Sequence, residues 1–294
     1  MQRPIITFLS DYGLADDFVG VCHAVIAGIC PQACVIDLTH GVPRHGVRAG
    51  AMILQATLPY LPVGVHLAVV DPGVGGERRA LALRLADDRM LVGPDNGLLW
   101  LAAVEGGGIV EAVDIGHSRF ALEPVSASFH GRDIFAPVAA RLAAGAPLAD
   151  AGRPCDPDAV VRLDFPRPRR GDDGVLIAHA TYVDRFGNVA LNVGRDELVG
   201  PAAVGDRVEL GGPGAVGDRV ELGRPGAAGD EVELLPASGA AHRARLVRTF
   251  GDAGPGELLI YEDSYRRLAV AVNQGDAAMR LGLAVDDELR IRLT

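Results

Sequence analysis

The feature that most constrains the fold is a series of short apolar runs, each followed by glycine and aspartate, with helical spacing between them. Residues 5–9, 34–38 and 65–70 are apolar runs of strand length, and residues 18–29 and 47–58 carry apolar residues at helical spacing. Strands that are buried on both faces have such continuous apolar sequences. The alternation therefore predicts an α/β N-terminal domain with a largely parallel central sheet.

The sequence changes character after residues 164–174, a stretch rich in proline, glycine and charge that is typical of a linker. Short strand-like runs separated by turn residues follow it. They are residues 175–183, 189–193, 207–210, 245–249, 258–262, 268–272 and 288–293. The sequence thus predicts an α/β domain over 1–163, a linker, and a smaller, mainly β domain over 175–294 that is barrel-like or sandwich-like.

A twelve-residue sequence is repeated in tandem within the predicted β domain. Residues 204–215 (VGDRVELGGPGA) recur almost unchanged as residues 216–227 (VGDRVELGRPGA), and a partial third copy follows at 228–234. The repeat is too short for a solenoid. We interpret residues 204–235 as a recent insertion. A neutral surface loop is the favoured interpretation, and an extra β-hairpin at an interface is the alternative.

The charge of the chain argues against a nucleic-acid-binding surface. Its 28 basic residues, all arginine, are outnumbered by 38 acidic residues, and the formal net charge is −10, whereas nucleic acid requires basic patches. No apolar run is long enough to cross a membrane. The cysteines, Cys22, Cys30, Cys34 and Cys155, are sparse and lack CxxC spacing. We therefore expect free thiols in a cytoplasmic protein without nucleic-acid or membrane partners.

Four segments carry the side chains that do chemistry. Residues 8–13, 70–78, 128–133 and 182–188 each place a charged or imidazole side chain near glycine, which permits close backbone approach. Two of them follow apolar runs, and open α/β sheets bind ligands at the carboxyl ends of their strands. The chain has neither a P-loop nor a GxGxxG motif, so a nucleoside triphosphate is not implied. Its scattered histidines and cysteines do not form a zinc-binding pattern.

In their order and spacing, these four segments resemble the S-adenosyl-L-methionine (SAM) hydroxide adenosyltransferases, also called SAM hydrolases (adenosine-forming). The resemblance covers residues 4–293 and is interrupted near 200–245. It implies hydrolysis of SAM to adenosine and L-methionine, with no cofactor and no metal. It also implies a homotrimer in which the substrate lies between the N-terminal domain of one chain and the C-terminal domain of its neighbour.

The resemblance assigns the reaction to Asp71, Arg78 and His130, which stand in the family's patterns D-P-G-V-G-x-x-R and F-H-G-R-D. Water or hydroxide attacks the ribose 5′ carbon, and L-methionine leaves. Because a sulfonium is already activated, the protein has only to orient the water and favour its more anionic form. The sequence leaves open which of the three residues takes the proton.

Two substrate-binding residues are implied in the N-terminal domain. Asp11 follows the first predicted strand, and the resemblance gives it the ribose hydroxyls. Asp16 matches a carboxylate that receives the methionine ammonium. Taken without the resemblance, Asp11 would be a turn or N-cap residue and Asp16 an exposed residue at the start of a helix.

The remaining substrate-binding residues are implied in the C-terminal domain. By resemblance, Asp184 binds the methionine ammonium and Asn188 the adenine edge. Ser264 contacts the methionine carboxylate, and the backbone at Val272 meets adenine. Tyr265 stands where halogenating relatives have an arginine, which puts the carboxylate contact in doubt. A simple hairpin turn is the alternative for the segment from Asp184 to Asn188.

Three other functions stay open. Halogenating relatives replace the histidine and the first aspartate of the catalytic set, and the fluorinating type carries a long insertion after the third strand. This chain keeps both residues, lacks the insertion, and has Gly131 where a halide-contacting residue would lie, so water is favoured over chloride. A non-catalytic SAM or adenosine sensor would bind without turnover. A metal hydrolase built on the Asp/His cluster would be sensitive to chelators.

Overall fold

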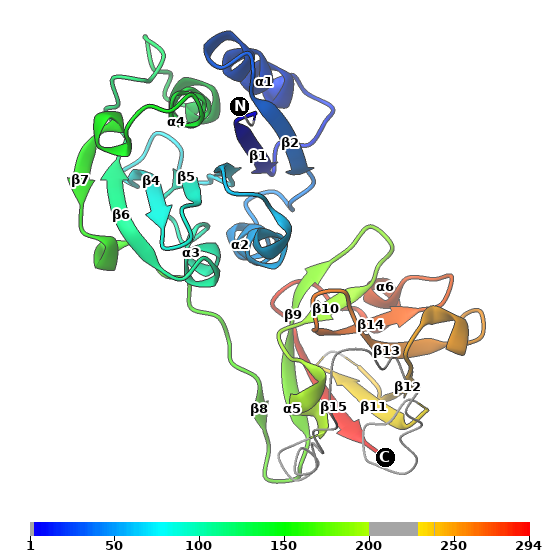
Figure 1. Ribbon diagram of the computed structural model, residues 1–294. Helices are drawn as coiled ribbons and strands as arrows, with labels where there is room; N and C mark the ends of the chain where they lie inside the picture. The colour runs from blue at the N-terminus through cyan, green and yellow to red at the C-terminus, as the bar shows by residue number, and fades with distance from the viewer. Residues whose placement is uncertain (1–2, 200–228, 238) are drawn as a thin grey trace, which may run out of the picture. The chain divides into compact units, whose positions relative to one another are not determined.

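The computed structural model describes residues 3–199, 229–237 and 239–294. The chain divides into two compact units, residues 1–164 and 165–294 (Figure 1). Each unit has its own hydrophobic core. The strand expected at 207–210 and most of the tandem insertion 204–235 lie outside the described residues.

A seven-stranded sheet forms the centre of the first unit, in the order β2–β1–β3–β5–β4–β6–β7. Its strands are β1 (Ile5–Ser10), β2 (Cys34–Thr39), β3 (Val65–Val69), β4 (Ala80–Leu85), β5 (Met90–Pro94), β6 (Ile109–Asp114) and β7 (Arg153–Cys155). The pairings among β2, β1, β3 and β5 are parallel, whereas β4 pairs antiparallel with β5 and β6, as β6 does with β7.

The sheet is therefore mixed, which corrects the expectation of a largely parallel one. The connection between β4 and β5 consists of residues 86–89 alone. So short a connection makes an antiparallel hairpin, because a parallel neighbour requires a crossover of a dozen or more residues. Only the first half of the sheet has the βαβ connections on which the expectation was based.

Helices cover both faces of this sheet (Figure 1). On one face α1 (Phe18–Ile29) packs against α4 (Ala136–Ala143), and on the other α2 (Val47–Thr57) packs against α3 (Trp100–Glu105). Every residue of β3 is buried, as expected for a strand between two helical layers. This is the layered α/β arrangement that the alternating sequence pattern predicts.

A closed barrel forms the second unit. Its strands run in the order β10–β14–β13–β12–β11–β15–β9, and pairing of β10 with β9 closes the ring. They are β9 (Leu176–Val183), β10 (Val189–Leu191), β11 (Glu231–Pro236), β12 (His242–Leu246), β13 (Leu258–Glu262), β14 (Leu268–Val272) and β15 (Glu288–Leu293). The described helices are α5 (Arg195–Val199) and α6 (Ala277–Leu281). The mainly β second domain is thus confirmed, in its barrel form.

The stretch 164–174, expected to be a linker, contains a short strand. β8 (Arg169–Arg170) pairs with β9 outside the closed ring. The Arg170 side chain also donates a hydrogen bond of 2.9 Å to the backbone carbonyl of Leu198. The end of this stretch is therefore fixed to the barrel.

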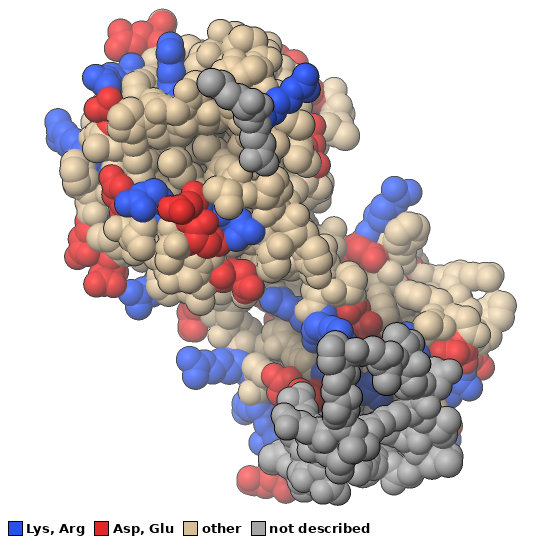
Figure 2. Space-filling view, viewed as in Figure 1, with Lys and Arg blue, Asp and Glu red and all other residues tan. Residues whose placement is uncertain are grey.

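Charged side chains of both signs are interspersed over the face of the molecule in Figure 2, and the described residues form no continuous basic surface there. No helix among the described residues is long and apolar enough to cross a membrane. All four cysteines are free, and Cys22 and Cys30 are buried.

A leucine in the central strand β3 tests this architecture. Leu67 is fully buried, whereas Leu14 is 79% exposed. We expect Leu67→Ala to lower the free energy of unfolding by about 2–5 kcal/mol, because it leaves a cavity in the core. The matched change Leu14→Ala should alter it by less than about 0.5 kcal/mol. Urea unfolding followed by circular dichroism measures both, and equal losses would contradict the placement of β3.

Candidate active site

Three of the four chemistry-bearing segments meet at one edge of the sheet in the first unit. β1 and β3 are parallel neighbours, with Ser10 opposite Val69, so the residues that follow them emerge side by side. Asp71 comes two residues after β3, and Arg78 comes two residues before β4. His130 immediately precedes a π-helical turn, Gly131–Phe135, that runs into α4. Such turns often occur at functional sites.

Arg78 links Asp71 and His130 into one hydrogen-bonded set. Its Nε donates to Asp71 Oδ1 at 2.9 Å, and its Nη2 donates to Asp71 Oδ2 and, at 2.8 Å, to His130 Nδ1. The side chains of Arg78 and Asp71 are only 11% and 6% exposed. The guanidinium also lies 5.4 Å from the ring centroid of Phe135. A fork-shaped, charge-assisted pair of this kind is strong and geometrically specific.

Glycine and buried polar side chains bring these loops together. Gly75 has a φ of +76°, and any side chain there would overlap with the backbone carbonyl of Ala127, so this loop packs directly on the loop that leads to His130. Asp133, which is buried, accepts a hydrogen bond of 2.8 Å from the backbone of Ser126. These contacts place the imidazole against the guanidinium.

Asp11, the residue predicted to bind the ribose hydroxyls, lies near Asp71 and Arg78, and all three surround Tyr12. Asp11 directly follows β1, and its Oδ2 accepts a hydrogen bond of 2.9 Å from the backbone N–H of His45. Its carboxylate is partly buried, whereas Asp16 is exposed in the loop before α1. Asp11 is therefore held in position by its surroundings, and Asp16 is not.

Tyr12 is a residue of this site that the sequence reasoning missed. A side chain at Gly131 would overlap with the Tyr12 hydroxyl, so the phenol lies directly over the residue that follows His130. Burial raises the pKa of Tyr12 well above its usual value, and the carboxylates of Asp11 and Asp71 contribute. The available signal was an aromatic residue immediately after Asp11 in a glycine-rich loop.

In the second unit, Asp184 and Asn188 lie in the hairpin turn between β9 and β10. Asp184 Oδ1 accepts hydrogen bonds from the backbone N–H groups of Phe186 and Asn188, and its Oδ2 accepts one of 2.8 Å from the Asn188 side chain. The structure therefore brings the two predicted residues together. It also shows that Asp184 stabilises the turn, which was the alternative interpretation.

Two further tyrosines lie near Asp184 and were missed from the sequence. Burial, followed by the charge of Asp184, raises the pKa of Tyr261 to about 12 and also raises the pKa of Tyr182. Ser264 is exposed in the turn between β13 and β14, and Val272 is buried at the end of β14. The Ser264 side chain is therefore accessible to a ligand, whereas the Val272 side chain is not, and the Val272 carbonyl accepts a hydrogen bond of 3.0 Å from Gly275.

The predicted residues therefore form two groups, one in each unit. Asp71, Arg78, His130 and Asp11 lie together in the first unit, and Asp184 and Asn188 lie together in the second. The first group offers a fixed cation and an imidazole beside the carboxyl ends of the parallel strands β1 and β3. The second offers amide, carboxylate and phenol groups on a barrel rim.

Known proteins are similar to this chain over nearly its whole length. The chain is 48% identical to the (R)-S-adenosyl-L-methionine hydrolase of Salinispora tropica, over 98% of this chain and 97% of that protein. It is 36% identical to the protein of the same name from Thermus thermophilus, over 96% of each. A fluorinase of an Actinoplanes species is more distant, at 30% identity over 67% of this chain and 74% of that protein.

A crystal structure of an uncharacterized conserved protein from Thermotoga maritima has a similar fold, with a TM-score of 0.82 and 35% identity, over 97% of this chain and 99% of that chain. Residues 6–152 match the N-terminal domain of the SAM hydroxide adenosyltransferases, and residues 178–290 match their C-terminal domain. The chain belongs to the SAM hydroxide adenosyltransferase family.

Proposed function

We propose that this protein hydrolyses S-adenosyl-L-methionine to adenosine and L-methionine. The observation that carries the proposal is the set of Asp71, Arg78 and His130, hydrogen-bonded at the carboxyl edge of the sheet. The family membership of the chain and the names of its relatives support the same reaction.

The reaction requires little from the protein besides orientation and a positive charge. The oxygen of water bonds to the ribose 5′ carbon, the carbon–sulfur bond breaks, and its electron pair returns to sulfur, which leaves as the neutral thioether of methionine. One proton is released from the attacking water. Orienting the reactants supplies up to about 7–11 kcal/mol in favourable cases, so a metal is not needed, and we propose that none takes part.

The hydrogen bonds of His130 fix its protonation. A guanidinium has only donors, so Arg78 Nη2–H must donate and His130 Nδ1 must accept. The imidazole is then neutral, and burial followed by the charge of Arg78 lowers its pKa. Because Nδ1 is occupied by the guanidinium, we assign His130 to positioning Arg78.

The free donors of Arg78 are on Nη1. Its Nε and Nη2 are used by Asp71 and His130, and among the described residues Nη1 has no hydrogen-bond partner. Two N–H groups of a buried, paired cation can therefore point at the nucleophile. We propose that they stabilise the negative charge that develops on the attacking oxygen. The released proton then passes to solvent, because both oxygens of Asp71 face the guanidinium.

We propose that a neighbouring chain completes the substrate-binding site. Family resemblance gives a homotrimer in which Asp184, Asn188 and Ser264 of one chain meet Asp11 and the catalytic set of the next. Asp11 offers two carboxylate oxygens for a vicinal diol, and Asn188 offers an amide for the adenine edge.

The adjacent arginines Arg78 and Arg79 allow a matched test of the mechanism. Arg78→Lys keeps the charge but loses the fork, so we expect kcat to fall by about 10²–10³-fold. Arg79 instead donates to Asp95 at 2.8 Å, so Arg79→Lys should lower kcat much less. Adenosine and methionine are measured by chromatography and mass spectrometry, with and without chloride and with EDTA present.

Each contrary result of that assay has a meaning. A 5′-chlorinated nucleoside would identify a halogenase. SAM that is bound but unchanged would favour the sensor, and activity abolished by EDTA would overturn the metal-free mechanism. Equal losses in Arg78→Lys and Arg79→Lys would remove Arg78 from its assigned role.

The pKa of His130 gives a second test. In Arg78→Gln the positive neighbour is gone, so we expect the pKa of His130 to rise toward the ordinary value of about 6.5. Arg79→Gln should leave it unchanged. Activity should be lost as pH falls through the lowered pKa of the intact site, because a protonated Nδ1 cannot accept from Arg78. NMR titration of the ring protons measures the pKa, and the same value in all three proteins would contradict the assignment.

Mixed oligomers test the shared site. We expect His130→Ala and Asn188→Ala each to be inactive when alone. Co-expressed in equal amounts, they should recover roughly a quarter of wild-type activity, because a cyclic trimer of both kinds keeps one intact interface. No recovery in oligomers shown by mass spectrometry to be mixed would place each site within a single chain.

A further inference from the structure

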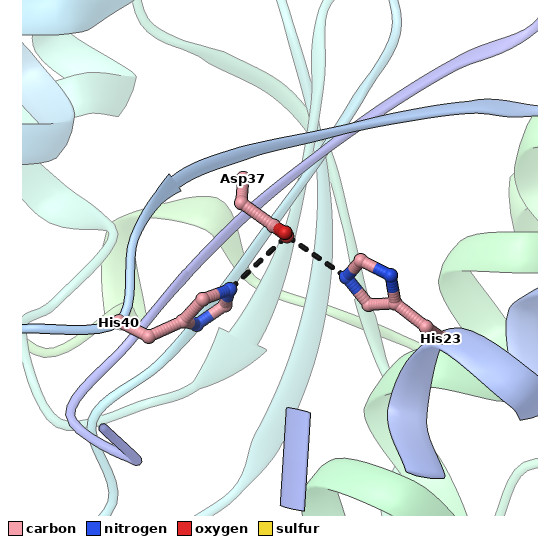
Figure 3. A group of neighbouring side chains, drawn as sticks. All are labelled: His23, Asp37 and His40. Atoms are coloured by element: carbon pink, nitrogen blue, oxygen red, sulfur yellow. Dashed lines mark hydrogen bonds and ion pairs between the residues drawn. The ribbon is translucent and has the colours of Figure 1, made fainter. Parts of the chain in front are cut away.

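Three side chains from separate elements converge at the outer edge of the first sheet. His23 lies on α1, Asp37 on the edge strand β2, and His40 just after β2 (Figure 3). His23 Nε2 is 2.8 Å from Asp37 Oδ1, and His40 Nε2 is 3.0 Å from the same oxygen. The scattered histidines form no metal-binding pattern in the sequence, because these three residues come together only when α1 packs on β2.

Asp37 lies between the two histidines, and one of them, His40, is buried and has an unpaired nitrogen (Figure 3). The His40 side chain is 2% exposed, and its Nδ1 lies 2.7 Å from the hydroxyl of Ser10. Its Nε2 lies at hydrogen-bonding distance from Asp37 Oδ1, yet it makes no hydrogen bond of acceptable geometry with any described residue. The nitrogen thus points beside the oxygen instead of at it. Two ligands of one ion have this relation, because each points at the ion. His23 Nε2 and Asp37 Oδ1, in contrast, are hydrogen-bonded to each other, a contact that a bound cation would replace.

The donor set suits a first-row divalent cation. One ligand atom from each of His23, Asp37 and His40 lies within 4.8 Å of the others. Two imidazole nitrogens and one carboxylate oxygen are a common zinc-binding set, with metal–ligand distances of about 2.0–2.2 Å. The bond from His40 Nδ1 to Ser10 is the outer contact that fixes the orientation of a metal-binding imidazole.

We propose that His23, Asp37 and His40 bind one divalent transition-metal cation of the zinc type. The His23 and Asp37 side chains are 35% and 41% exposed, so the cation reaches the site from solvent. Water completes its coordination. The site is distinct from the catalytic set and does not depend on the proposed hydrolysis.

The site is placed to stabilise the loop that carries Asp11. The backbone carbonyl of His40 accepts a hydrogen bond of 2.7 Å from Gly13, and Ser10 immediately precedes Asp11. A cation bound only by the folded chain raises stability by mass action. It would therefore hold the ends of β1 and β2 in their folded arrangement without touching the substrate.

Metal binding to the whole, tag-free protein is the direct test. After metal is removed by dialysis against chelator and zinc or cobalt is added back, we expect one ion to bind per chain, and cobalt to give visible d–d bands without a thiolate band. At a hundredfold excess over Kd, zinc should raise Tm by about 5 °C. His23→Gln keeps a hydrogen-bond donor for Asp37 but removes a ligand, so it and Asp37→Asn should each weaken binding at least ~10-fold.

The matched control is His117→Gln, a change at an exposed histidine outside the group, which should bind cobalt as the unaltered protein does. The proposal is overturned if the unaltered protein takes up no stoichiometric metal. It is also overturned if His23→Gln and Asp37→Asn bind cobalt with unchanged affinity, or if the bound cobalt shows thiolate bands. None of these readouts uses SAM, so failure here and failure of the proposed hydrolysis are distinguishable.

Discussion

The active site depends on one buried guanidinium. Arg78 is almost enclosed by protein, and a buried charge is tolerated when an opposite charge and hydrogen bonds compensate it. Asp71 supplies the opposite charge and His130 accepts a further hydrogen bond, so three loops that are distant in sequence are held in one arrangement. The same pairing leaves two N–H groups on Nη1 directed by a rigid framework. In the proposed mechanism, stability and preorganisation for an anionic nucleophile therefore have a common physical origin.

The two units carry different groups of the predicted site residues. The sheet edge of the first unit carries the guanidinium of Arg78 and the carboxylate proposed to bind the ribose. The barrel turn at Asp184 and Asn188 carries the groups proposed to recognise the amino acid and the base. Asp184 is saturated by hydrogen bonds within its own turn, which makes the turn rigid before any ligand arrives. A rigid turn loses little entropy on binding, so it is a suitable recognition element even though it also has a structural role.

The group of His23, Asp37 and His40 lies on the far side of β1 from helix α2 and is connected to the catalytic loops through Ser10 and Gly13. It resembles the catalytic set in one respect: both join residues of different elements through a single shared charged group. It differs in exposure, because its carboxylate is open to solvent. An exposed carboxylate is suited to binding a cation that exchanges with solvent, whereas the reacting water is proposed to lie at the buried guanidinium of Arg78.

The sequence by itself predicted the alternating strands and helices at the start of the chain and the change to a β-rich second domain, because apolar periodicity is a local signal. The residues of the catalytic set were predicted from motifs that resemble those of the family. Tertiary structure decided what depends on contacts between distant residues. The hairpin from β4 to β5 made the sheet mixed, Gly131 admitted the Tyr12 phenol, and α1 brought His23 to Asp37. The protonation of His130 was likewise decided by its distance from Arg78, since a sequence carries residue types but not the direction of their hydrogen bonds.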